Sequence, residues 1–249
     1  MYFLFAFGIV LLNSINGYSD IPILSGLIMS MLHVISGPDH LAAVTPLSID
    51  SKKKSWAIGL FWGIGHTAGM LIIGLIFILL REKINIDLLS ANGEKTVGFL
   101  LIGIGIYSLL KINKKHSGKH THPHTHGNEV HIHFHKHEQE ETHEHTHKLN
   151  HKANMFGALG IGILHGVAGV SHLFAILPTL ALPTRSDSIL YLSSFGAGTI
   201  LAMVAYASAI GLISKKADAS NNGKISLFLR IFGGAAAIIV GIVWIVLSF

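Results

Sequence analysis

Long apolar runs separated by short charged stretches dominate the chain. Six runs carry few or no charged residues, and they cover residues 21–49, 55–80, 96–110, 153–184, 188–214 and 231–249. Each spans, or nearly spans, the ~20 residues that an α-helix needs to cross a bilayer. The first and fourth runs are too long for one straight crossing, which predicts tilted or broken helices there.

A shorter apolar stretch precedes the first run, at residues 2–12. It could be a seventh span, an interfacial segment or the core of a signal sequence. It has neither a basic leading region nor an obvious small-residue cleavage site, so we favour a helix inserted in the membrane over a cleaved signal.

The composition supports a membrane protein. Half of the residues are hydrophobic and 12% are charged, against about 25% charged residues in a typical soluble domain. The 27 glycines suit the close helix contacts of a membrane bundle. Cysteine is absent, which excludes disulfides, thiolate metal sites and thiol-redox chemistry. We therefore expect an all-α, polytopic membrane helix bundle with six to seven spans.

The basic residues predict the orientation of the spans. Of the 18 lysines and arginines, 14 fall around residues 52–54, 111–152 and 215–230, which are alternate loops. The positive-inside rule assigns these loops to the cytoplasm and the C-terminus to the outside of the plasma membrane. These charges flank the spans, so they indicate how the spans are oriented in the lipid bilayer. We therefore expect the bilayer as partner and no nucleic-acid partner.

The loop between the third and fourth runs is rich in histidine. It holds 13 of the 18 histidines, mixed with Thr, Glu, Lys and Pro, and nothing in it could form an apolar core. We expect a disordered cytoplasmic loop that binds metal, buffers or senses it, and is dispensable for permeation. Its candidate ligands are His120, His122, His124, His126, His131, His133, His135, His137, His143, His145 and His147.

The two halves of the chain resemble each other. Residues 32–43 align with residues 164–175 at an offset of 132, and the alignment pairs His33 with His165. Three spans separate the aligned segments, so the second half enters the membrane from the opposite side, as in transporters with inverted repeats. The predicted divisions are an N-terminal segment (1–20), a first repeat (21–111), the histidine-rich loop (112–152) and a second repeat (153–249).

Five histidines fall inside the apolar runs. His33, His66 and His165 lie about eleven residues into theirs, or roughly 16 Å deep, near the bilayer midplane. His40 and His172 follow seven residues after the first and last of these, which predicts two helical turns further along the same face. Ionisable residues at such depth are costly and usually functional.

A helix break is predicted beside the first histidine pair. Gly37 and Pro38 interrupt the first run, and proline frees backbone carbonyls in a helix. With Asp39 this makes a cation site that suits Ni²⁺, Co²⁺ or Zn²⁺ as transported substrate, with no prosthetic group. The candidate ligands are His33, Asp39, His40, His66, His165 and His172.

These motifs resemble the nickel/cobalt transporter family, in particular its branch of urease-accessory-like membrane proteins. His33 followed by Asp39-His40 matches the family signature, with five intervening residues where the high-affinity permeases have four. Residues 61–67 (Phe-Trp-Gly-Ile-Gly-His-Thr) match a second motif. The acidic motif that the permeases carry in their second half is absent. The resemblance implies movement of Ni²⁺ or Co²⁺ across the plasma membrane.

Other functions fit parts of the sequence. A transporter of another metal such as zinc would also carry a histidine-rich loop, and a non-transporting accessory protein could deliver nickel to a metalloenzyme. An intramembrane metalloenzyme is disfavoured because Asp39 is the single carboxylate of the set and no separate general base accompanies it. Uptake and efflux use the same ligands, and the cytoplasmic loop slightly favours efflux.

Overall fold

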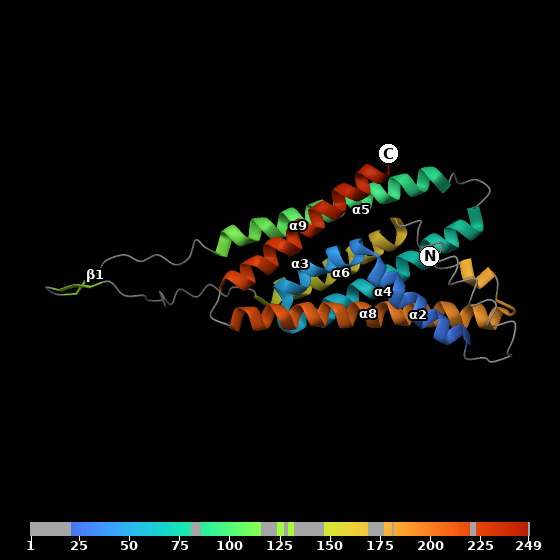
Figure 1. Ribbon diagram of the computed structural model, residues 1–249, viewed down its shortest axis with the longest axis horizontal. Coiled ribbons are helices and arrows are strands. Elements are labelled where there is room, and N and C mark those ends of the chain that lie inside the picture. Colours follow the sequence, from blue (N-terminus) through green and yellow to red (C-terminus); the bar gives the residue numbers. More distant parts are fainter. Residues whose placement is uncertain are drawn as a thin grey trace.

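The computed structural model describes residues 21–80, 86–115, 124–126, 129–131, 147–168, 177–180, 182–219 and 223–248. Within these residues the chain forms seven α-helices, two 3₁₀ segments and one pair of short strands (Figure 1). The elements are α2 (Ile21–Ser36), α3 (Pro38–Ser51), η1 (Lys52–Lys54), α4 (Ser55–Leu80), α5 (Ile86–Lys115), β1 (His124–His126), β2 (Glu129–His131), α6 (His147–Ala168), η2 (Leu177–Leu180), α8 (Arg185–Ala219) and α9 (Gly223–Leu247).

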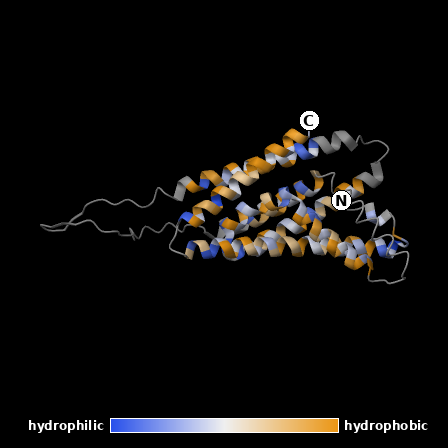
Figure 2. Cartoon of the chain, in the orientation of Figure 1, coloured by the Kyte–Doolittle hydropathy of each residue, from blue (hydrophilic) through white to orange (hydrophobic). Residues whose placement is uncertain are grey.

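The chain is a multi-pass membrane protein built from helices. Four segments are long and apolar enough to cross a bilayer: Ser55–Ile76, Asn92–Ile112, Arg185–Ala219 and Lys224–Leu247. The bent pair α2 and α3 makes a fifth, and α6 holds a shorter apolar stretch, Asn154–Ala168. Apolar positions run along the helices, and hydrophilic ones gather mainly toward their ends (Figure 2). Large apolar side chains such as Phe232 and Leu247 are more than 60% exposed, as a lipid-facing surface requires.

All six predicted runs are at least partly helical, but several boundaries differ from the prediction. Helix α6 begins at His147, inside the region predicted as loop, and is described as far as Ala168. Residues 169–176 of the fourth run lie outside the described residues. The apolar pattern marks only the part of a helix that faces lipid, whereas polar turns extend a helix into water. Residues 1–20 and most of the loop lie outside the described residues. Inside the loop, β1 and β2 pair antiparallel, with His124 opposite His131.

The helix directions match an inverted repeat. A Cβ added at Gly59 would collide with Met203, and one added at Gly211 would collide with Ser55. Helices α4 and α8, the equivalent helices of the two halves, therefore run antiparallel. Gly98 lies against Gly241 and Gly105 lies against Gly234, so α5 runs antiparallel to α9. Equivalent helices must be antiparallel when the two halves cross the membrane in opposite senses.

Two further helix pairs cross between the halves, and both are parallel. Helix α4 packs on α6, and α8 packs on α2. The repeat relates α2 to α6 and α4 to α8, so the two contacts are equivalent. Glycines make the α4–α6 contact close: a Cβ at Gly65 would meet Leu159, and one at Gly162 would meet Trp62. Gly65 and Gly69 of α4 therefore lie in a close helix contact, as the glycine-rich composition predicts. In Figure 1, α3, α4 and α6 lie between the α5–α9 pair and the α2–α8 pair.

Candidate metal centre

The first predicted span is broken where Gly37 and Pro38 interrupt it. Helix α2 ends at Ser36, α3 begins at Pro38, and the two helices are bent by 73°. Gly37 adopts an extended backbone (φ −90°, ψ 93°) as the residue before α3, and proline suits the first helical position that follows. A Cβ at Gly37 would collide with the His40 ring. The break is thus the point where the backbone makes room for a histidine.

Asp39 lies in the first turn of α3 and bridges the two halves of the protein. Its side chain is buried, and a helix N-terminus favours a negative charge there. One carboxylate oxygen, Oδ1, lies 2.9 Å from Nδ1 of His40. The other, Oδ2, lies 2.8 Å from Nε2 of His165 on α6. An ionised carboxylate accepts only, so both ring nitrogens must donate to it.

His33 and His66 approach each other beside His40, with ring centroids 4.7 and 4.9 Å from that of His40. Their Nε2 atoms are 3.4 Å apart, which is long for a hydrogen bond between rings. Two nitrogen ligands about 2.1 Å from one ion are separated by about 3.0 Å in octahedral and about 3.4 Å in tetrahedral geometry. The spacing of these two nitrogens therefore matches that of two ligands on one tetrahedral metal ion.

The five side chains form two overlapping ligand triads. One contains His33, His40 and His66, the other contains Asp39, His40 and His165, and in each the ligand atoms lie within 4.8 Å of one another. His40 belongs to both. With Nδ1 donating to Asp39, the neutral ring of His40 can coordinate through Nε2. The first triad offers an all-imidazole position. The second becomes a mixed carboxylate–imidazole position when a cation replaces the proton that His165 donates to Asp39.

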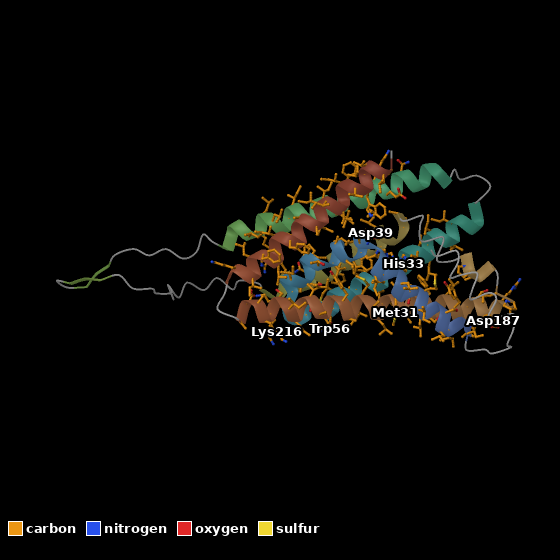
Figure 3. The ribbon with its side chains drawn as sticks, in the orientation of Figure 1. Met31, His33, Asp39, Trp56, Asp187 and Lys216 are labelled. Atoms are coloured by element: carbon orange, nitrogen blue, oxygen red, sulfur yellow. The ribbon has the colours of Figure 1, made fainter. Side chains whose placement is uncertain are left out.

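The centre is buried midway along the bundle. His40, His66 and His165 are each at most 2% exposed. His33 and Asp39 lie near the middle of the bundle, whereas Asp187 and Lys216 mark its two ends (Figure 3). A cation held there is removed from water, so its charge depends on Asp39 and imidazole for compensation.

Trp62 is a part of the centre that the sequence reasoning missed. It is fully buried and stacks on His66, with ring centroids 4.7 Å apart and planes 13° apart. It also contacts His40 and His165, at 5.4 and 5.5 Å between centroids. Trp62 and His66 are four residues apart on α4 and therefore share a helix face, a spacing that could have identified it.

The structure brings five of the six predicted intramembrane residues together: His33, Asp39, His40, His66 and His165. The sixth, His172, lies outside the described residues, as do the side chains of the predicted loop ligands. The prediction that His40 lies two helical turns beyond His33 on one face is wrong, because the chain bends between them. The bend turns Asp39 toward His165, so the centre joins both halves.

Comparison with known proteins gives the family. A family model described as "Cytochrome C biogenesis protein transmembrane region" matches residues 21–243. The chain belongs to this family. The match covers every described helix almost to the last turn of α9, and thus both halves of the bundle and all five residues of the centre.

Three curated relatives add detail. Two are the Arabidopsis thaliana proteins named "Chloroplast protein FOR GROWTH AND FERTILITY" 1 and 2, which are 36% and 35% identical over 192 residues, 77% of this chain. The chain spans only about half of their length, 50% and 47%. The third is "Urease accessory protein UreH" of Bacillus sp. (strain TB-90), 33% identical over 189 residues, 75% of each protein. No solved structure matches the chain.

Proposed function

We propose that this protein moves a divalent transition metal ion, Ni²⁺ or Co²⁺ first, across the membrane through the centre of four histidines and Asp39. The observation that carries the proposal is His40, which is shared between two triads at the middle of the bundle. A transporter needs ligands at mid-depth that both sides can reach in turn.

The ligand chemistry favours late first-row metals. Imidazole suits nickel, copper and zinc, and affinity for such nitrogen sites rises toward the end of the series. A single carboxylate with several imidazoles is too poor in oxygen for Mg²⁺ or Ca²⁺. The resemblance to nickel/cobalt transporters and the relative named as a urease accessory protein both favour nickel over zinc.

Neutral imidazoles bind the metal, so ion entry displaces protons from any protonated histidine. This provides a simple route for coupling metal flux to a proton gradient. The ligands do not define the direction of transport, because the same centre can serve both uptake and efflux. The histidine-rich loop between α5 and α6, if cytoplasmic, could collect metal for export.

The three lysines of η1, which follows α3, and the lysine-rich ends of α5 and α8 lie at one end of the bundle. There Lys52 pairs with Asp218, and Lys111 pairs with Asp50. We assign this end to the cytoplasm and the protein to the plasma membrane. The His/Asp set is proposed to act in transport and not in catalysis.

A second candidate is a membrane accessory protein that delivers metal to an enzyme without transporting it. The name of the Bacillus relative, urease accessory protein, favours this function. In that case the centre would hold an ion and release it to a soluble partner, and no net flux across a sealed membrane would occur.

Reconstitution into liposomes with a metal-sensitive dye inside tests these functions. Influx of Ni²⁺, Co²⁺, Zn²⁺ and Mn²⁺ would be compared with and without a pH gradient. We expect Ni²⁺ or Co²⁺ influx above that of empty vesicles and a change in rate with the gradient. Faster Zn²⁺ influx would reassign the substrate. No influx of any metal by folded protein would favour the accessory function.

A further inference from the structure

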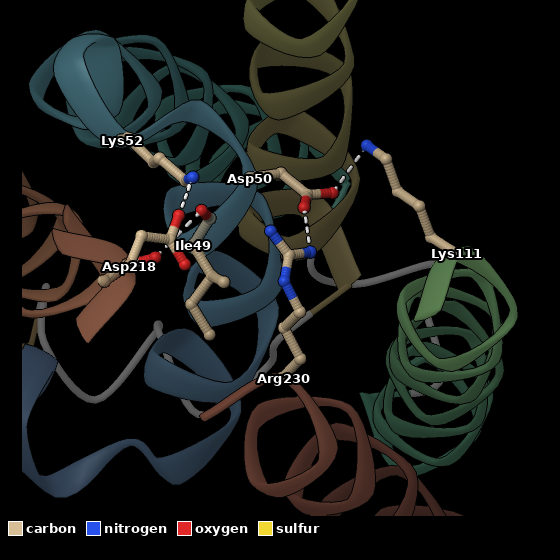
Figure 4. Close-up of polar contacts among 7 residues, drawn as sticks. Ile49, Asp50, Lys52, Lys111, Asp218 and Arg230 are labelled. Atoms are coloured by element: carbon tan, nitrogen blue, oxygen red, sulfur yellow. Dashed lines mark hydrogen bonds and ion pairs between the residues drawn. The ribbon is translucent and has the colours of Figure 1, made fainter. Parts of the chain in front are cut away.

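The helix that carries Asp39 and His40 ends in a buried ion-pair cluster. Asp50, in the last turn of α3, accepts from Arg230 of α9 at 2.5 Å and from Lys111 of α5 at 2.7 Å (Figure 4). The Asp50 and Arg230 side chains are only 10% and 7% exposed, and that of Lys111 is 32% exposed. One carboxylate therefore ties the end of α3 to a helix of each half.

This cluster differs from an ordinary surface ion pair. Removing one partner of a buried pair leaves an uncompensated charge away from water, which is far more costly than loss of an exposed pair. At the same end of the bundle, Lys52 pairs with Asp218, but both side chains are 31% exposed, and such a pair contributes little. The chain thus contains a buried ion-pair cluster and, beside it, an exposed pair for comparison.

The backbone leaves regular helical geometry at both ends of α3. Gly37 separates it from α2 at the 73° bend. Lys52 follows its other end with φ 38°, and it is the one non-glycine residue with positive φ in the described part of the chain. A positive φ is strained for a side chain as large as lysine and marks a backbone held by its surroundings.

A cavity flanks α3. It has a volume of about 330 Å³ and lies along α3 between α8 and α9, with Leu41 and Ile49 on one side and Phe232 on the other. One hydrogen bond ties α3 to α8 beside it, between Thr45 Oγ1 and the Tyr206 hydroxyl. A close-packed flank would resist displacement of a helix, whereas a void beside it does not.

We propose that Asp50, Lys111 and Arg230 form a latch that holds the lysine-rich end of the bundle closed, with α3 as the lever between latch and metal centre. The inference rests on the proposed transport function for its link to metal. An ion that draws His40 toward His33 on α2 and His66 on α4 shifts the first turn of α3. The helix passes this movement to Asp50 at its other end. Opening the latch then exposes the path from the centre to the lysine-rich side.

The repeat does not duplicate Asp50. An offset of 132 or 133 residues between the halves carries Asp50 onto Leu182 or Pro183, neither of which is charged. The repeat-related position at the opposite end therefore has no carboxylate equivalent to Asp50. This asymmetry makes one of the two access states depend on the latch.

The chain contains no cysteine, so a single introduced thiol reports access without background. Ser48 lies in the last turn of α3 and is fully buried, and Ser48→Cys is a small change. Labelling by a soluble maleimide would be measured for S48C alone, for S48C with Asp50→Asn, and for S48C with Asp218→Asn as the matched control. We expect labelling at least ten times faster with Asp50→Asn, no change with Asp218→Asn, and faster labelling of S48C alone when Ni²⁺ is added.

Equal rates for S48C with and without Asp50→Asn would overturn the latch, as would an equal increase in the Asp218→Asn control. If added Ni²⁺ leaves the labelling rate of S48C unchanged, α3 does not act as a lever. If Asp50→Asn does not fold, Lys111→Gln removes the more exposed partner and is expected to speed labelling about threefold. Labelling does not require transport, so the two proposals can fail separately. If the labelling rates follow the predicted pattern but liposomes show no metal influx, the latch is supported and only the proposed transport function is wrong.

Discussion

At the scale of single residues, Asp39 explains why the centre has its shape. Its two oxygens hold His40 and His165 in defined orientations, and a carboxylate that bonds to a histidine fixes the tautomer of the ring. The sequence predicted Asp39, four histidines and the break at Gly37, because ionisable residues stand out in apolar runs. It did not predict that Asp39 turns to His165, which depends on a 73° bend that no spacing encodes.

Replacing Asp39 by asparagine keeps the volume and removes one acceptor and the negative charge. We expect Ni²⁺ affinity to fall by about 10- to 100-fold, measured by calorimetric titration of detergent-purified protein with the loop replaced by a linker. Asp187→Asn is the control, because this exposed carboxylate pairs with Thr184 at the far end of α8. Wild-type affinity in the Asp39→Asn variant would show that the carboxylate does not organise the ligands.

Gly37 tests the geometry of the break. An added methyl group would displace His40, so Gly37→Ala should weaken Ni²⁺ binding by about tenfold or more while the helical content in circular dichroism is unchanged. Gly103→Ala, where a Cβ meets nothing within 4 Å, should bind like the wild type. Normal binding by Gly37→Ala would mean that His40 does not hold the ion.

At the scale of helices, glycine contacts decide which helices pair. Sequence periodicity predicted the number of apolar runs and the inverted repeat. It could not predict the parallel pairing of α4 with α6. The role of Gly65 and Gly162 is to let two backbones approach closely, and the sequence does not show which backbones these are. The helix ends were also misjudged, since α6 extends into a polar, histidine-containing turn that hydropathy assigns to a loop.

Two neighbouring glycines of α6 give a direct test of this packing. A Cβ at Gly162 would meet the Trp62 carbonyl, whereas one at Gly160 meets nothing within 4 Å. We expect Gly162→Ala to lower the free energy of unfolding by about 1–3 kcal/mol through overpacking. Gly160→Ala should be neutral or stabilising by up to about 1 kcal/mol because alanine favours the helix. Thermal unfolding in detergent would compare them, and equal melting temperatures would contradict the close α4–α6 contact.

At the scale of the whole molecule, the two halves contribute unequally to one centre. The first half supplies His33, Asp39, His40 and His66, whereas the second half supplies His165. At the position of the second half that is related to His66 there is a threonine, Thr199. The repeat therefore supplies the bundle and its inverted sense, while the ligand set has diverged. Transport through such a centre needs the halves to move against each other around His40.

The histidine-rich loop is predicted to be separable from this core. Replacing residues 117–145 by a flexible Gly/Ser linker of about 15 residues leaves α5 and α6 intact. We expect metal flux within about twofold of the wild type and a large loss in the number of ions bound at saturation. Both would be measured on the same preparation, by liposome influx and by metal analysis. Complete loss of flux in a folded variant would make the loop part of the path.

The most direct test of the account is the initial rate of Ni²⁺ influx into liposomes for the loop-replaced protein and its His40→Ala variant. His40 is the one residue common to both ligand triads. The account predicts clear influx for the parent and a rate indistinguishable from empty vesicles for the variant, with equal amounts of folded protein in each. Influx at the parental rate without His40 would contradict a path through this centre.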